Sequence, residues 1–169
     1  MQRWLARRLD STATVYVACA ATLVLGLIFV FVWAPHPWGW QGIDQYHELA
    51  RALARGEPFG TTDVPWGYAY YIAAVYALFG EEPWIPVTLQ ACINAALPLL
   101  LFHLVRPLAG QRIAVLSAVL TGLFSFNTVY ASTQSTDSIC TVLFIAALVA
   151  LSRAMRTPRW PWFALAGAL

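Results

Sequence analysis

The stretch STATVYVACAATLVLGLIFVFVW, residues 11–33, decides the fold class of this chain. It runs for 23 residues without a charged side chain, whereas about 20 apolar residues suffice for a helix to cross a hydrocarbon core of roughly 30 Å. Its apolar part is also longer than the roughly 7–15 residues found in a cleaved signal peptide. We therefore predict an uncleaved transmembrane helix.

The composition of the whole chain also indicates a membrane protein. Of its 169 residues, 60% are hydrophobic and 11% are charged, and the mean hydropathy is +0.63. An ordinary soluble domain has about 45–50% apolar and about 25% charged residues. The net charge of +2 is small and scattered along the chain, which excludes the concentrated basic surface of a nucleic-acid-binding protein.

Further apolar stretches predict an all-α protein with several spans. Residues 85–105, 113–131 and 133–151 are each long enough, or nearly so, to cross the hydrocarbon core, and another apolar run starts at residue 160. We predict one polytopic transmembrane domain over residues 1–169. Because the run from residue 160 is too short to span, we expect this chain to be the N-terminal part of a larger domain and inactive by itself.

The segment 34–84 is predicted to be an outer loop that carries two interfacial helices. In 43–55, apolar side chains fall on one helical face and charged side chains on the opposite face, as in a helix that lies on a membrane surface. The stretch 66–79 is apolar, but its 14 residues make only about 21 Å of helix. We therefore expect this second helix to be interfacial or re-entrant.

The positions of the arginines favour this topology. If 66–79 does not span, eight of the ten arginines lie on the side of the N-terminus, against Arg51 and Arg55 on the other side. If it does span, the split becomes three to seven. Since short cytoplasmic loops carry an excess of basic residues, we predict a cytoplasmic N-terminus. Seven of the eight carboxylates then lie on the outer side.

Three aspartates at the predicted outer face are candidates for chemistry. Asp44 opens the first interfacial helix, Asp63 lies in the loop before the second, and Asp137 lies just inside the start of an apolar helix. Each also has a structural interpretation, as a helix cap, a turn residue and a first-turn carboxylate respectively. Because an ionisable group within a span is costly, we expect Asp137 to face the protein interior.

Other polar residues are expected to have structural roles. His47 and Glu48 follow Asp44 by three and four residues and could share a helical face with it, which would suit a metal or acid-base site. A solvated polar face is the simpler interpretation, and we adopt it for His47. For Asn94, inside the second span, we expect a hydrogen bond to a neighbouring helix or an interfacial position.

Four motifs follow one another in the chain: IDQYHELARALARGEPFG (43–60), DVPWGYAYYIAAVYALFG (63–80), LLFHLVRPLAGQRIAVLSAVLTGLF (100–124) and STQSTDSICTVLF (132–144). Their order resembles that in family 39 glycosyltransferases of the GT-C superfamily, which include protein mannosyltransferases and lipid A aminoarabinose transferases. The likeness covers nearly the whole chain, but only the N-terminal part of such an enzyme. It implies a GT-C-like transmembrane fold.

The resemblance also implies roles for individual residues. It makes Asp44 the catalytic carboxylate, although Gln45 stands where the family usually has a second acidic residue. Asp63 and Tyr68 match a family stretch in which an acidic residue precedes Pro and Tyr, and Asp137 corresponds to an acidic residue at the outer end of the fourth span. These three residues would bind the substrate or its phosphate, and Asp63 would also be the ligand of a divalent metal.

The implied reaction transfers a sugar from a polyprenyl-phosphate donor to a hydroxyl of a lipid, glycan or protein, with Asp44 as general base. It would take place at the outer face of a bacterial inner membrane. Two other functions fit the same sequence. One is a transporter or flippase with aspartates along its path, although such charges usually lie near the midplane. The other is a noncatalytic subunit of a membrane assembly.

Overall fold

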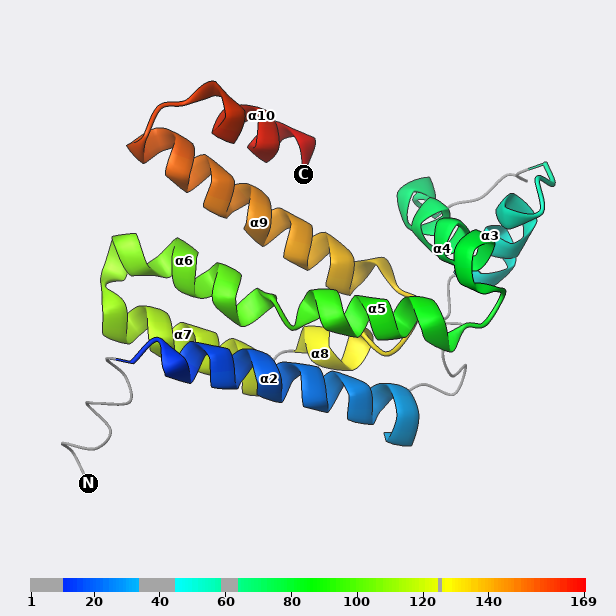
Figure 1. The fold of residues 1–169 in the computed structure, drawn as a ribbon, viewed down its shortest axis with the longest axis horizontal. Helices are drawn as coiled ribbons and strands as arrows, with labels where there is room; N and C mark the ends of the chain where they lie inside the picture. Colours follow the sequence, from blue (N-terminus) through cyan, green and yellow to red (C-terminus); the bar gives the residue numbers. More distant parts are fainter. Residues whose placement is uncertain (1–10, 34–44, 59–63, 125) are drawn as a thin grey trace.

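The computed structural model describes residues 11–33, 45–58, 64–124 and 126–169, and every regular element in these ranges is helical (Figure 1). This result confirms the predicted all-α fold class. The elements are α2 (Ala13–Ile28) with a π-helical turn (Phe29–Trp33), α3 (Tyr46–Ala54), α4 (Trp66–Phe79), α5 (Trp84–Asn94), α6 (Leu97–Ala109), α7 (Gln111–Phe124), α8 (Phe126–Tyr130), α9 (Thr136–Arg156) and α10 (Trp160–Ala168).

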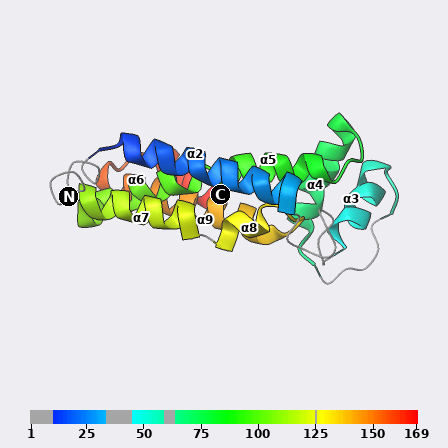
Figure 2. The same ribbon diagram turned by 90° about the horizontal axis from the view of Figure 1, so that it is seen from below.

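Three helical segments in the described part of the chain are long and apolar enough to cross a membrane: Ala13–Trp33, Trp84–Ala109 and Thr136–Arg156. A helix of 21 residues is about 31 Å long, which matches the hydrocarbon core. These segments and α7 lie side by side as one bundle (Figures 1 and 2). The chain is therefore a polytopic membrane protein, as the sequence predicted.

The second of these segments is broken near its middle. Helix α5 ends at Asn94 and α6 begins at Leu97, because Pro98 has no N–H to donate to the carbonyl four residues earlier. The side chain of Asn94 is buried, and its Oδ1 accepts a hydrogen bond from Asn127 Nδ2 at 2.9 Å. The helix-to-helix hydrogen bond predicted for Asn94 is confirmed.

The stretch 113–131, which we expected to be one span, contains two helices instead. Helix α7 ends at Phe124, and α8 covers the five residues Phe126–Tyr130. Tertiary hydrogen bonds hold α8 against α9, because Ser138 Oγ donates to the backbone carbonyl of Asn127 at 2.9 Å. No local pattern in the sequence indicates this contact.

Small side chains let α2 and α7 approach closely. Ala18, Thr22 and Gly122 are buried, and Thr22 Oγ1 donates to the carbonyl of Ala18 at 2.8 Å and lies 3.4 Å from that of Gly122. A Cβ on Gly122 would fall 2.8 Å from Thr22 Oγ1. Close contacts of this kind are typical of helices that pack inside a membrane.

Helices α3 and α4 pack on each other at one end of the bundle (Figures 1 and 2). Both belong to the predicted outer loop, and α4 occupies the stretch 66–79 in which we expected a helix. It ends at Gly80, whose φ of 94° is one that other residues rarely adopt. The interfacial position of the two helices stays a prediction.

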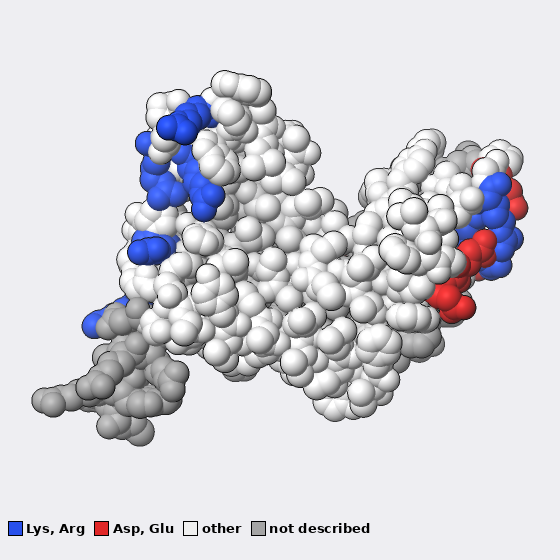
Figure 3. Space-filling view, in the orientation of Figure 1, with Lys and Arg blue, Asp and Glu red and all other residues white. Residues whose placement is uncertain are grey.

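Charged side chains lie at the two ends of the bundle and leave an uncharged belt between them (Figure 3). The end with α3 and α4 carries acidic residues together with Arg51 and Arg55. The opposite end, where α6 and α9 finish, carries arginines without a visible acidic residue on this face. This distribution agrees with the predicted topology, because arginines concentrate on the cytoplasmic side.

Candidate functional site

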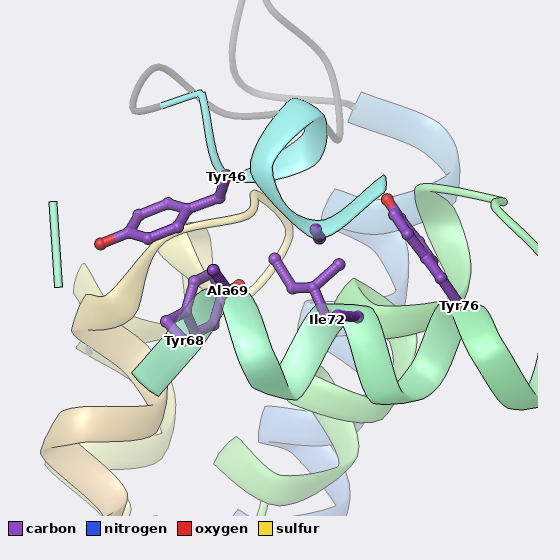
Figure 4. Packing of buried hydrophobic residues seen from close by; sticks show 7 residues of the cluster. Tyr46, Tyr68, Ala69, Ile72 and Tyr76 are labelled. Atoms are coloured by element: carbon purple, nitrogen blue, oxygen red, sulfur yellow. The ribbon is translucent and has the colours of Figure 1, made fainter. Parts of the chain in front are cut away.

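Helices α3 and α4 meet through a cluster of aromatic and small side chains (Figure 4). The rings of Tyr46 and Tyr68 lie edge to face with their centroids 4.8 Å apart, and Ile72 lies between the two helices. All three side chains are buried. This contact removes the apolar face of α3 from water and brings the first turn of α3 against the first turn of α4.

The hydroxyl of Tyr76 is the centre of a buried hydrogen-bond chain. It lies 2.8 Å from His47 Nδ1 on α3, and it accepts a hydrogen bond of 2.8 Å from Gln134 Nε2, in the turn before α9. Gln134 is fully buried, and its Oε1 has no hydrogen-bond partner among the described residues. One hydroxyl therefore links α3, α4 and the segment that leads into α9.

The prediction that His47 lies on a solvated face is wrong. Its side chain is 9% exposed, and burial lowers the pKa of its imidazole below the ordinary value. The charged face of α3 is instead formed by Glu48, Arg51 and Arg55. The sequence could not show that Tyr76, 29 residues further along the chain, offers a buried hydroxyl to the imidazole.

A second buried chain starts at Tyr68. Its hydroxyl donates to Gln90 Oε1 on α5, and Gln90 Nε2 donates to the carbonyls of Tyr130 at 3.2 Å and Thr133 at 3.0 Å. Burial raises the pKa of Tyr68 well above the ordinary value, and the backbone of Ser135 partly offsets this rise. Tyr68 is therefore a neutral hydroxyl that lies next to the start of α9.

Burial also raises the pKa of Tyr76 to about 12. Two tyrosines that remain protonated at neutral pH and a histidine whose pKa is lowered hold their positions by neutral hydrogen bonds. These three side chains therefore link helices through neutral hydrogen bonds, and their shifted pKa values do not favour proton transfer at neutral pH.

An ion cluster fixes the other end of α3. Glu81, directly after α4, accepts hydrogen bonds from Arg51 Nε at 2.9 Å and from Arg55 Nε at 2.8 Å, with a third from the terminal nitrogen of Arg55 at 2.6 Å. The hydrogen bonds from Arg55 contribute most and that from Arg51 contributes less. Together they lower the pKa of the Glu81 carboxyl group to about 2. Two arginines at the predicted outer face are thereby occupied by a carboxylate.

An apolar cavity of about 510 Å³ lies between α4, α5 and α9. Tyr68 and Tyr71 form its wall on the side of α4, and Thr136, Cys140 and Leu143 form its wall on the side of α9. The three α9 residues follow one another at helical spacing. The lining is almost entirely apolar, and Tyr68 and Thr136, at the starts of α4 and α9, are its hydroxyl-bearing residues at that end.

The four residues predicted for the site fall into two groups. Asp44 and Asp63 lie outside the described residues, whereas Tyr68 and Asp137 are described. Asp137 is exposed, so the expectation that it faces the protein interior is wrong for this structure. The Ser135 hydroxyl donates to the Asp137 carboxylate and caps α9. Since Ser135 also lies next to Tyr68, the structure brings Tyr68 and Asp137 to the same region.

The described residues do not form a metal site by themselves, since no three of their His, Cys, Asp or Glu side chains gather closely enough to hold an ion. His47 Nε2 and Glu48 Oε1 are 4.0 Å apart. The sequence did not indicate the roles of Tyr76, Gln90 and Gln134. A glutamine in an otherwise apolar helix, such as Gln90, is the one signal that could have indicated a buried polar network.

Residues 63–169 match the protein family described as dolichyl-phosphate-mannose-protein mannosyltransferase. The match covers well over half of the chain, so the chain belongs to this family of membrane glycosyltransferases of the GT-C type. The family resemblance inferred from the four motifs is therefore confirmed. Comparisons with curated proteins and with solved structures found no match.

Proposed function

We propose that this protein transfers a sugar from a polyprenyl-phosphate donor to an acceptor hydroxyl at the outer face of a bacterial inner membrane. The family match over residues 63–169 carries the proposal, because the donor named in the family description is a polyprenyl-phosphate sugar. The layout of the chain supports it. Such a donor keeps its hydrocarbon tail in the bilayer and its polar head at the interface, and it needs a polar site at the ends of apolar helices.

In the proposed reaction, the acceptor oxygen attacks the anomeric carbon of the sugar. The bond between this carbon and the phosphate oxygen breaks, and the electron pair leaves with the polyprenyl phosphate. The proton of the acceptor hydroxyl goes to the carboxylate of Asp44, which acts as general base. The packing of Tyr46 on Tyr68 supports this role, because Tyr46 follows Asp44 by two residues and Tyr68 is a proposed donor-binding residue.

The donor's phosphate would bind at the starts of α4 and α9. We assign its recognition to Tyr68, Asp63 and Asp137, with the isoprenoid chain in the apolar cavity beside Tyr68. A carboxylate near a phosphate requires a cation between them, and Asp63 is the residue proposed to hold a divalent metal there. We assign the acceptor to the same side of the membrane, at the end of the bundle where the charged residues of α3 and the Glu81 carboxylate lie (Figure 3).

The experiment compares two kinds of sugar donor. The protein, as its gene encodes it, is reconstituted in liposomes with either a radiolabelled polyprenyl-phosphate sugar or a nucleotide sugar. We expect labelled acceptor and free polyprenyl phosphate with the lipid-linked donor alone. Transfer from the nucleotide sugar would contradict the proposal. Movement of the intact lipid-linked sugar between leaflets, without cleavage, would instead identify a flippase.

A further inference from the structure

Basic residues of two different helices line one cavity at the end of the bundle opposite α3 and α4. His103 and Arg106 come from the last turns of α6, and Arg153 and Arg156 come from the last turn of α9. Together with Pro107, they enclose about 340 Å³. A second cavity of about 330 Å³ shares Arg153 and Arg156 and adds Thr157, Arg159 and Trp162. Four guanidinium groups therefore line one continuous region.

Three of these guanidinium groups contact neutral partners, and that of Arg106 lies over the ring of Phe102, 5.6 Å from its centroid. In the described part of the chain, no carboxylate lies within 4.0 Å of Arg106, Arg153, Arg156 or Arg159. Arg153 lies over the ring of Trp162, 5.1 Å from its centroid, and Arg156 Nε donates to the carbonyl of Ser152 at 3.0 Å. Since a guanidinium has five N–H donors, these contacts leave donors that can bind an anion.

An apolar groove continues from the basic cavity. It has a volume of about 340 Å³, and Leu104 and Leu108 of α6 face Leu148, Leu151 and Met155 of α9 across it. Pro107 and Arg156 line both the groove and the basic cavity. A ligand that fills both would have an anionic head and a hydrocarbon tail.

We propose that this region binds an anionic phospholipid, with its phosphate on Arg106, Arg153 and Arg156 and an acyl chain between α6 and α9. Charge complementarity selects an anionic head, and continuity with the groove selects a lipid over a soluble phosphate. Basic pockets between membrane helices are suited to anionic headgroups, and Trp162 occupies the kind of position that aromatic residues take at a membrane interface. The site lies at the opposite end from the proposed donor site, and its ligand is not a substrate.

The experiment measures retention of lipid by the purified full chain in a neutral detergent, with native mass spectrometry as the readout. The probes are phosphatidylglycerol, phosphatidylcholine with the same acyl chains, and inorganic phosphate. We expect one phosphatidylglycerol to be retained about tenfold or more strongly than phosphatidylcholine, with no retention of inorganic phosphate. Equal retention of the two lipids, or binding of inorganic phosphate alone, would overturn the proposal.

Two variants test the two parts of the site. Replacing both arginines, Arg106→Gln with Arg153→Gln, should lower phosphatidylglycerol retention about tenfold or more, whereas Leu148→Trp should fill the groove and lower the retention of both lipids. Arg112→Gln is the matched control, because Arg112 lies in the first turn of α7 at the same end and lines neither cavity. If Arg112→Gln has the same effect as the double variant, only general surface charge attracts the lipid and the proposal fails.

Circular dichroism and size-exclusion chromatography establish that each variant is folded. If the double variant does not fold, Arg156→Gln and Leu148→Trp are compared with Arg112→Gln in the same assay. Retention that is unchanged in both of these variants would overturn the proposal as well.

Discussion

The hydroxyl of Tyr76 lies 2.8 Å from both His47 Nδ1 and Gln134 Nε2, and it joins three segments that are far apart in the sequence. Both partners are buried, so neither can turn to bulk water if the hydroxyl is removed. Tyr76 therefore connects α3 to the segment that leads into α9. Because α3 begins two residues after Asp44, this chain of hydrogen bonds would also help to position the proposed general base.

The variant Tyr76→Phe should destabilise the protein by about 1–3 kcal/mol, because two buried polar groups lose their partner. Thermal unfolding in detergent measures the effect. Tyr16→Phe is the matched control, since Tyr16 is 63% exposed on α2, and it should change stability by less than about 0.5 kcal/mol. Equal stability of the two variants would show that the hydrogen-bond chain contributes nothing to the fold.

Stability should depend on pH through His47. Burial lowers the pKa of the imidazole in the folded protein below 6.5. At pH values between this lowered pKa and about 6.5, the unfolded chain therefore binds more protons than the folded protein. The neutral imidazole therefore makes its full contribution to the free energy of unfolding above about pH 6.5, and this contribution is lost as the pH falls through this range. We expect the unfolding temperature to decrease as the pH is lowered from 8 to 5.5.

The variant His47→Gln should show a smaller fall over the same range, because glutamine does not titrate. Glu81 does not interfere, since its pKa changes from 4.5 to about 2 on folding and its contribution is lost only as the pH falls below about 4.5. Identical pH profiles for His47→Gln and the parent would mean that His47 is not the titrating group.

Close packing of α2 on α7 makes Gly122 sensitive to substitution. In Gly122→Ala the new Cβ would meet Thr22 Oγ1 at 2.8 Å and the carbonyl of Ala18 at 3.1 Å, so we expect a loss of about 1–3 kcal/mol. Gly167→Ala, on α10, meets no atom within 4 Å and should leave stability unchanged or raise it by up to about 1 kcal/mol. A stable Gly122→Ala protein would show that the two helices have room to separate.

Much of the fold could be predicted from the sequence, because hydrophobic length and helix-breaking residues are local properties. The first apolar stretch and the amphipathic pattern before Gly56 suffice to predict a long apolar helix and α3. The contacts of α8 could not be predicted, since the hydrogen bonds of Asn127 with α5 and α9 join residues that are distant in the sequence. Helix α9 extends to Arg156 because charged residues end a membrane span without ending a helix.

Less of the candidate site could be predicted. The family motifs indicate Tyr68 and Asp137, which the structure places near Ser135. The burial of His47 and the partners of Gln90 and Gln134 are tertiary properties. Hydropathy alone predicts that His47, Gln90 and Gln134 lie on a surface. It takes no account of the hydroxyl and carbonyl groups that the folded chain places next to these side chains.

The predicted topology can be tested by cysteine labelling from the outside of intact cells. After the three native cysteines are replaced by alanine, a cysteine at Glu82 should react with a membrane-impermeant maleimide, and one at Gln111 should not. Glu82 suits the test because it is exposed and, unlike Glu81, forms none of the ion pairs of the described residues. The reverse pattern would place α3 and α4 on the cytoplasmic side.

The central claim is that Asp44 is the general base of a sugar transfer, and not only a helix-capping residue, which is the other role that its position in the sequence allows. In the structure the N-cap of α3 is Gln45, whose side chain forms no capping hydrogen bond. Asparagine caps a helix about as well as aspartate, but it cannot accept the proton of the acceptor hydroxyl. The variant Asp44→Asn therefore separates the two roles. Loss of a general base costs about 10²–10⁴ in rate, whereas loss of a cap costs about 1 kcal/mol of stability.

The most direct measurement is the turnover of a polyprenyl-phosphate sugar by Asp44→Asn and by the parent, in the protein as its gene encodes it, with the unfolding temperature of both recorded. The account predicts a rate that is at least about 100-fold lower at an unchanged unfolding temperature. Turnover close to that of the parent would contradict the account and leave Asp44 without a catalytic role.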